Sequence, residues 1–232
     1  MIDLIHDYWV YFLIGQYPDG PLGGLSLTLI LASLGLLLAF PLGLLIGLAR
    51  VSTHAALRWT TTGLITLVRG TPLLMVVFWV YFFLPAVTGH QTGQFPTMLA
   101  ALVLFNGVYI AEILRAGIQG LPKGQMEAAR SLGFGYLGAM RHVVLPQVLR
   151  NMLPSLVNQF VATIKDTSLG YIIGLTESSF IASQINTQVL TKPTQVYFLL
   201  GLSYFILCFG LSRLAYWLER RLSARAPAKA YA

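Results

Sequence analysis

Charged and amide side chains lie inside apolar stretches of this chain, where they could bind the polar groups of a solute. Lys165 and Asp166 are adjacent within the apolar stretch 153–175, and Asn158 precedes Lys165 by roughly two helical turns. A charge at the centre of a bilayer costs about 2.5–3.5 kcal/mol, so these groups should face protein or water. The stripe could line a translocation route, or it could form a structural ion pair with neighbouring helices. The hydroxyls of Thr167 and Ser168 can satisfy backbone groups there.

Arg69 is a second candidate, in the apolar stretch 63–84. It is followed by Gly70, Thr71 and Pro72. Pro72 removes a backbone hydrogen bond and Gly70 loosens the same turn, so a kink is expected. A guanidinium beside exposed carbonyls suits carboxylate recognition, which makes Arg69 and Thr71 candidates for a substrate pathway. Arg69 could equally extend to the membrane interface.

Glu112 lies near the end of the apolar stretch 96–114. With Asn106 and Tyr109 it recurs every three residues and could form another polar stripe. Arg115 follows Glu112 at i+3, and we favour a surface ion pair between them.

The sequence contains no motif for catalysis. The patterns GxxxxGK[ST], HExxH and GxSxG do not occur, and the four histidines are scattered. We therefore expect no catalytic residues, no metal site and no cofactor. The energy for any active process must come from another protein.

The composition is typical of a membrane protein. Of 232 residues, 56% are hydrophobic and only 10% are charged, whereas soluble domains carry about 25% charge. Cys208 is the only cysteine, so no intrachain disulfide can form. The N-terminus has two acidic and no basic residues before its apolar part, unlike a cleavable signal. We expect it to be retained as an interfacial helix.

Five stretches are long and apolar enough to be spans, so we predict an all-α integral membrane protein. They are 23–49, 63–84, 96–114, 153–175 and 196–217.

Basic residues in the loops set the orientation. An odd number of spans puts the termini on opposite sides, and twelve of the fifteen basic residues fall on one side. That side is expected to be cytoplasmic, with the C-terminus and the segment 120–146, and the N-terminus lies outside. The twelve are Arg50, Arg58, Arg115, Lys123, Arg130, Arg141, Arg150, Arg213, Arg220, Arg221, Arg225 and Lys229.

The segment 120–146 is a polar island between two spans. Pro122 can begin a helix, and good helix formers follow from Lys123 to Leu132. Gly133 can adopt the left-handed conformation that ends a helix. Pro146 disfavours helix at Leu145 and marks a second boundary. We expect a short helix held outside the membrane.

This island resembles the EAA loop of ABC importer permeases. The resemblance rests on Glu127-Ala128-Ala129, Gly133 and Leu145-Pro146, in this order. Other segments narrow it: RGTPLL at 69–74, AEILRAGIQGLPKGQMEAARSLG at 111–133, LPQVLRNMLPSLVNQF at 145–160 and IKDTSLGYIIGLTE at 164–177. Over about 23–222 the chain resembles the permease subunits of polar amino-acid ABC importers.

The resemblance implies a bacterial inner-membrane, multi-pass subunit that does not itself hydrolyse ATP. Residues 23–222 would form the transmembrane domain, 1–22 an extracytoplasmic segment and 223–232 a cytoplasmic tail. The implied partners are a cytoplasmic ATP-binding subunit, an extracytoplasmic solute-binding protein and a second permease subunit, identical or not. The island helix would couple to the ATPase, through Gly124, Glu127, Ala128, Ala129, Gly133, Leu145 and Pro146.

Polar L-amino acids are the implied substrates, with glutamine, glutamate or aspartate favoured. The substrate pathway would include Arg69, Thr71, Asn158, Lys165, Asp166 and Ser168. The alternative is an autonomous ion-coupled carrier or channel that uses Lys165, Asp166 and Glu112 as an ion path. Such a protein has no use for a docking helix.

Overall fold

The computed structural model describes residues 2–224, and all regular secondary structure within this range is helical. The last eight residues, most of the expected tail, lie outside the described part. The helices are α1 (Ile2–Ile14), α2 (Gly24–Arg50), α3 (Ala55–Arg69), α4 (Leu73–Phe78), α5 (Leu84–Thr88), α6 (Gln94–Gln119), α7 (Lys123–Ser131), α8 (Tyr136–Ala139), α9 (Leu145–Asp166), α10 (Ser178–Val189) and α11 (Pro193–Ala224), with π-helical turns η1 (Trp79–Phe83) and η2 (Met140–Val144) and a 3-10 helix η3 (Thr167–Ile173).

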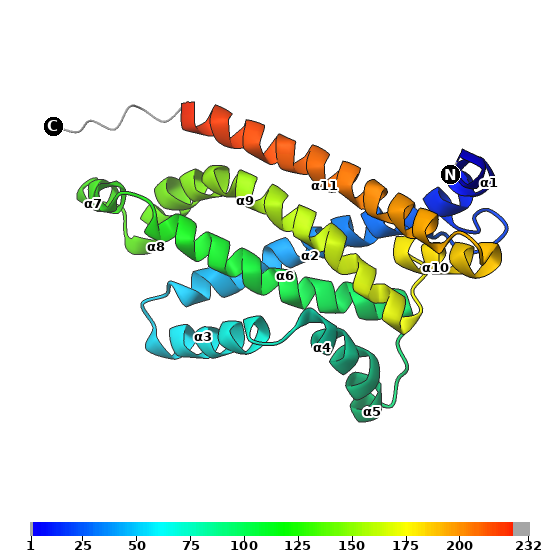
Figure 1. The fold of residues 1–232 in the computed structure, drawn as a ribbon. Coiled ribbons are helices and arrows are strands. Elements are labelled where there is room, and N and C mark those ends of the chain that lie inside the picture. Colours follow the sequence, from blue (N-terminus) through cyan, green and yellow to red (C-terminus); the bar gives the residue numbers. More distant parts are fainter. Residues whose placement is uncertain (1, 225–232) are drawn as a thin grey trace.

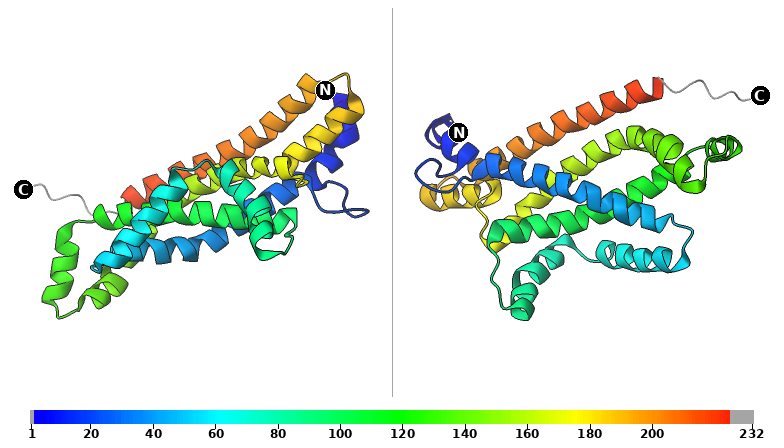
Figure 2. Two further views of the ribbon diagram at one scale, coloured as in Figure 1. Left: turned by 90° about the horizontal axis from the view of Figure 1, so that it is seen from below. Right: turned by 180° about the vertical axis from the view of Figure 1, so that it is seen from behind.

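Four long helices, α2, α6, α9 and α11, run along the length of the molecule (Figure 1). Their sequence directions bring the ends of α2, α6 and α11 and the start of α9 to one end. The short helices α7 and α8 extend from this end (Figure 2). The N-terminal helix α1 and the helix α10 lie at the opposite end.

The tightest pairing is between α2 and α6, and it depends on glycines. A Cβ on Gly43 would lie 2.6 Å from the Cβ of Ile110, and one on Gly47 would lie 2.8 Å from Leu114. On the facing helix, a Cβ on Gly107 would lie 2.9 Å from Leu42. Small residues let helix backbones approach closely, which is how helices associate in membranes.

Three helices, α2, α6 and α11, are long and apolar enough to cross a membrane. The pair α3 and α4–α5 would make a fourth crossing if it counts as one bent span. Helix α9, where we expected the fourth of five spans, is not among them. Its 22 residues extend roughly 33 Å at 1.5 Å per residue, but it carries polar residues such as Arg150, Asn151 and Gln159.

The expected kink in 63–84 is a sharp break. Helix α3 ends at Arg69 and α4 begins at Leu73, with a bend of 100° between α3 and the segment 73–88. Pro72 has an extended ψ of 139°, and the side chain of Thr71 donates to the carbonyl oxygen of Leu67 at 2.8 Å. A proline cannot supply the N–H that would continue α3, so the chain turns here.

The prediction that Pro146 disfavours helix at Leu145 is wrong. Leu145 is helical, with φ −60° and ψ −42°, and begins α9 directly after the π-helical turn η2. A π turn shifts the hydrogen-bond register by one residue and so can accommodate a proline that lacks an N–H. The non-helical link after α7 lies earlier, at Gly133 to Gly135.

Helix also ends earlier than expected in 153–175. The α-helix stops at Asp166 and continues as the 3-10 helix η3 to Ile173, before Gly174 adopts a left-handed φ of 78°. Gly170 allows the tight packing of this turn, because a Cβ there would lie 2.9 Å from Leu175.

Candidate functional site

Helix α7 is the short helix expected in the polar island. Pro122 precedes it with φ −56° and ψ 131°, and it ends at Ser131. Gly133 has a φ of +88°, a conformation that glycine adopts without strain. Its N–H donates to the carbonyl oxygen of Arg130 at 3.0 Å, which closes the end of the helix.

The two alanines of α7 face opposite ways. Ala129 is 3% exposed and packs inward, whereas Ala128 and Glu127 are exposed. Close approach of another protein to this helix would therefore occur at Ala128. Gly124 is also exposed, and a Cβ there would meet nothing within 4 Å.

Large apolar side chains are exposed just after α7. Leu132 is 81% exposed and Leu137 is 80% exposed, with Phe134 and Tyr136 partly exposed beside them. Leu145 packs against the buried cluster around Val144, and Pro146 is exposed. The end of the molecule at α7 therefore presents apolar side chains to its surroundings.

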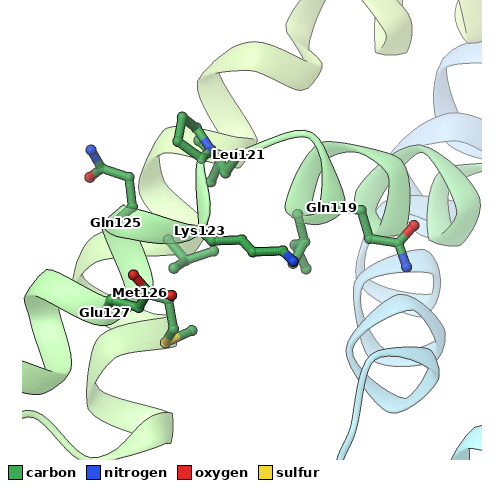
Figure 3. A pocket seen from close by; sticks show the side chains of 9 residues that line it. Gln119, Leu121, Lys123, Gln125, Met126 and Glu127 are labelled. Carbon is green, nitrogen blue, oxygen red and sulfur yellow. The ribbon is translucent and has the colours of Figure 1, made fainter.

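A hollow of about 530 Å³ lies between α7 and the last turn of α6. Met126 and Leu121 form part of its apolar wall. Figure 3 shows the side chain of Lys123 extended toward the last turn of α6, and Gln125 also lines the hollow. Gln147 of α9 donates to Gln125 at 3.1 Å, which ties α7 to α9.

Asn106 is the polar centre of the contact between α6 and α9. It is fully buried, and its side-chain oxygen accepts from Gln159 Nε2 at 2.7 Å and from Thr163 Oγ1 at 2.9 Å. Its amide nitrogen donates to the carbonyl oxygen of Leu102 at 2.8 Å. This network holds polar groups where lipid could not solvate them.

Of the candidate pathway residues, Asn158 lies next to Gln159 on α9, Lys165 and Asp166 lie at the end of α9, and Ser168 lies in η3. Asn158 and Lys165 are exposed, whereas Asp166 and Ser168 are half-buried. The hydroxyl of Ser168 donates to the carbonyl oxygen of Lys165 at 2.6 Å, as expected for a hydroxyl that satisfies a freed backbone group. Lys165 and Asp166 form no salt bridge with each other.

Arg69 and Glu112 lie together, which the sequence did not indicate. Glu112 forms the expected i,i+3 pair with Arg115, at 3.0 Å between Nη2 and Oε2. Arg69 Nη1 also lies 3.7 Å from Glu112 Oε2, and Arg50 Nε lies 3.8 Å from Oε1. The Glu112 side chain is 17% exposed, so the pair is not the surface pair that we favoured. We call these four residues the Glu112 cluster.

Glu177 is a structural residue that the sequence analysis missed. It is fully buried after η3, and Oε1 accepts from the N–H groups of Ser179 at 2.9 Å and Phe180 at 3.1 Å. Tyr204 donates to Oε2 at 3.2 Å. Burial raises the pKa of Glu177 to about 7, although these donors oppose the shift. Asp, Asn, Ser and Thr are the usual caps, so a glutamate there gave no signal.

Within the described residues, no group of His, Cys, Asp and Glu side chains is arranged to hold a metal ion. The candidate site therefore consists of separate groups of polar residues along α6 and α9 and of the exposed short helix α7 at one end of the molecule.

Comparison with known proteins places the chain in a family. The family model for the inner membrane component of binding-protein-dependent transport systems matches residues 39–224. The amino-acid ABC transporter permease protein YhdY of Escherichia coli K12 is 39% identical over 93% of this chain, which spans only 60% of that protein. The probable glutamine ABC transporter permease protein GlnM of Bacillus subtilis 168 is 37% identical, over 84% of this chain and 89% of the relative.

A solved structure agrees with this assignment. The crystal structure of an amino acid ABC transporter with histidines superposes with a TM-score of 0.82 at 32% identity, over 94% of this chain and 96% of that one. The chain therefore belongs to the family of inner membrane components of binding-protein-dependent transport systems, among the amino-acid ABC transporter permeases.

Proposed function

We propose that this chain is the transmembrane subunit of an ATP-driven importer of polar L-amino acids, with glutamine, glutamate or aspartate favoured. A separate cytoplasmic ATPase supplies the energy, an extracytoplasmic solute-binding protein delivers the substrate, and a second permease subunit, identical or related, completes the pathway. Residues 23–222 form the transmembrane domain, 1–22 the extracytoplasmic segment and 223–232 the cytoplasmic tail. The relative named as a probable glutamine permease supports this substrate class.

The proposed topology has five spans, with the N-terminus outside. Helix α9 is the additional span, and its polar residues Gln159 and Thr163 are tolerated because they face α6. Its contacts with α6 and α11 support this, as does the burial of the Asn106 network. The basic residues Arg50, Arg130 and Arg221 lie at the end of the molecule that carries α7, which supports a cytoplasmic location for α7.

The exposed short helix α7 is the observation that carries the proposal. It extends beyond the long helices, offers the acidic Glu127 and small Ala128, and is followed by the exposed Leu132 and Leu137. An autonomous channel or ion-coupled carrier would gain nothing from this apolar surface in water. A partner that covers it would remove the apolar area from solvent, which favours association. Gly133 sets the direction of the helix, and Leu145-Pro146 lie in the continuous helix at the start of α9.

The translocation route, in this proposal, passes Asn158, Lys165, Asp166 and Ser168. A charged pair at the end of α9 can contact both ends of a zwitterion. Arg69 and Thr71 contribute from the break between α3 and α4.

The test is binding of the cognate ATPase subunit by a Glu127→Arg variant. The substitution reverses one exposed charge, and like charges across an interface cost several kcal/mol. We expect at least about a tenfold loss of affinity in co-purification or surface plasmon resonance, and a matching loss of ATP-driven uptake in proteoliposomes.

Asp19→Arg is the matched control, because it makes the same charge change at an exposed site of the opposite end. It should leave ATPase binding unchanged. Unaltered binding and uptake in Glu127→Arg would refute the coupling role of α7. Uphill transport by the chain without nucleotide or other subunits would favour the ion-coupled carrier.

A further inference from the structure

The Glu112 cluster gathers charges from three helices around one carboxylate. Arg50 ends α2, Arg69 ends α3, and Arg115 lies one turn after Glu112 on α6. The distances to Glu112 are 3.8 Å for Arg50, 3.7 Å for Arg69 and 3.0 Å for Arg115. One carboxylate faces three guanidinium groups, which leaves the cluster with a net charge of +2.

The carboxylate of Glu112 does not satisfy the donors that surround it. Arg115 Nε donates to both carboxylate oxygens of Glu112, each at 3.1 Å. The Nε atom of Arg50 is buried and has no hydrogen-bond partner. Arg69 approaches only to 3.7 Å, beyond hydrogen-bond distance, and lies over the ring of Tyr109 with 5.5 Å between Cζ and the ring centroid. A buried donor without an acceptor destabilises the folded chain, so the cluster as it stands has fewer acceptors than donors.

A hollow of about 410 Å³ opens beside these donors. Arg50, Arg69, Tyr109 and Glu112 line it, with Thr66 from α3. Its volume lies within the range of sites that bind small molecules. Arginines near helix ends can simply offset the helix dipole, but here Arg50 and Arg69 turn toward Glu112 rather than toward the last carbonyl groups.

The position of the Glu112 cluster along α6 can be compared with that of Lys165 along α9. Asn106 of α6 contacts Gln159 of α9, which fixes a common level for the two helices. At about 1.5 Å per residue, Glu112 lies roughly 9 Å from this level toward α7, and Lys165 lies roughly 9 Å from it in the other direction. Glu112 and Lys165 therefore lie on opposite sides of the Asn106 network.

We infer that the Glu112 cluster is a second binding site, on the cytoplasmic side of the Asn106 network, for the carboxylate of the transported amino acid. This inference rests on the proposed function. Arg69 supplies the donors and Arg50, whose Nη1 donates to Thr62, adds positive charge. A guanidinium binds a planar carboxylate through two parallel hydrogen bonds. Glu112 holds the three arginines together, which would otherwise repel one another. Because the site binds the carboxylate that all amino acids share, it accepts an amino acid with any side chain.

The test is the unfolding temperature of the full chain in detergent, titrated with sodium acetate as the simplest carboxylate. At about ten times its dissociation constant, acetate should raise the midpoint by about 3 °C. Acetamide has the same size but no charge and should have no effect. Arg69→Gln should abolish the shift, and Arg69→Lys should retain part of it because the charge remains. Arg58→Gln is the matched control, since Arg58 is exposed on the same helix.

An equal acetate shift in Arg69→Gln and Arg58→Gln would overturn the inference. So would an equal or larger shift with sodium phosphate at the same ionic strength, because the site would then suit a phosphate, such as that of a lipid headgroup. In proteoliposomes of the assembled transporter, Arg69→Gln should lower glutamine uptake about tenfold. Failure of the wild type to take up any amino acid would refute the proposed function, while the acetate titration would still report on the cluster.

Discussion

Two half-buried or buried glutamates are held by different means in this chain. Glu112 is surrounded by the guanidinium groups of three helices. Among the residues that the structure describes, no cation lies within salt-bridge distance of Glu177, which is held by the first N–H groups of α10 and by the hydroxyl of Tyr204. Dipoles stabilise a buried charge less than ions do, so Glu177 holds its proton more tightly than a free glutamate.

The stability of the folded chain should therefore fall as pH rises past the pKa of Glu177. Burial raises that pKa from 4.5 to about 7. Between these values the folded state binds more protons than the unfolded state, so the free energy of unfolding decreases with rising pH. We expect it to be lower at pH 8 than at pH 5 by about 1 kcal/mol or more, measured by thermal unfolding in detergent.

The substitution Glu177→Gln should flatten this pH dependence, because glutamine does not titrate and can still accept from Ser179 and Phe180. Glu219→Gln removes an exposed glutamate of α11 and should leave the slope as in the wild type. A wild-type slope that persists in Glu177→Gln would show that another group is responsible.

Helices α2 and α6 form the most extensive contact between two helices in the described part of the chain. Gly43→Ala places a methyl group where the Cβ of Ile110 lies 2.6 Å away, so the helices must separate. Overpacking of this kind costs about 1–3 kcal/mol. The unfolding temperature should fall by several degrees, and the fraction of monodisperse protein in gel filtration should fall with it.

Gly63→Ala provides the comparison, since nothing lies within 4 Å of a Cβ on Gly63 in α3. Alanine favours a helix by up to about 1 kcal/mol over glycine. This variant should be as stable as the wild type or slightly more so. Equal losses in both variants would contradict close packing at Gly43.

Local signals predicted some elements well and others not. The uncharged stretch 23–49 matches α2, and Pro122 with Gly133 bounds α7, because such signals act within one turn. The π turn at 140–144 and the 3-10 turn after Asp166 were missed, because backbone geometry there depends on packing against other helices. The Glu112 cluster needed Arg50 and Arg69 from two other helices, and no spacing in the sequence indicates that contact. Only its i,i+3 pair with Arg115 could be predicted.

At the scale of the whole molecule, the two ends differ in chemistry. Arg50, Arg115 and Arg221 lie toward the end that carries α7, and the acidic Asp7 and Asp19 lie toward the other. Basic loops remain in the cytoplasm when a membrane protein inserts. The coupling and import roles proposed above both require that α7 be cytoplasmic. A measurement of the orientation of the chain therefore tests both.

Cysteine labelling in intact cells tests this orientation. In a Cys208→Ser background, which removes the only native thiol, Ser131→Cys marks the end of α7 and Asp19→Cys marks the opposite end, and both positions are exposed. A membrane-impermeant maleimide should label Asp19→Cys in intact spheroplasts and should label Ser131→Cys only after permeabilisation. The reverse pattern would place α7 outside, where no ATPase could reach it, and would leave the exposed Leu132 and Leu137 as a surface for an extracytoplasmic protein instead.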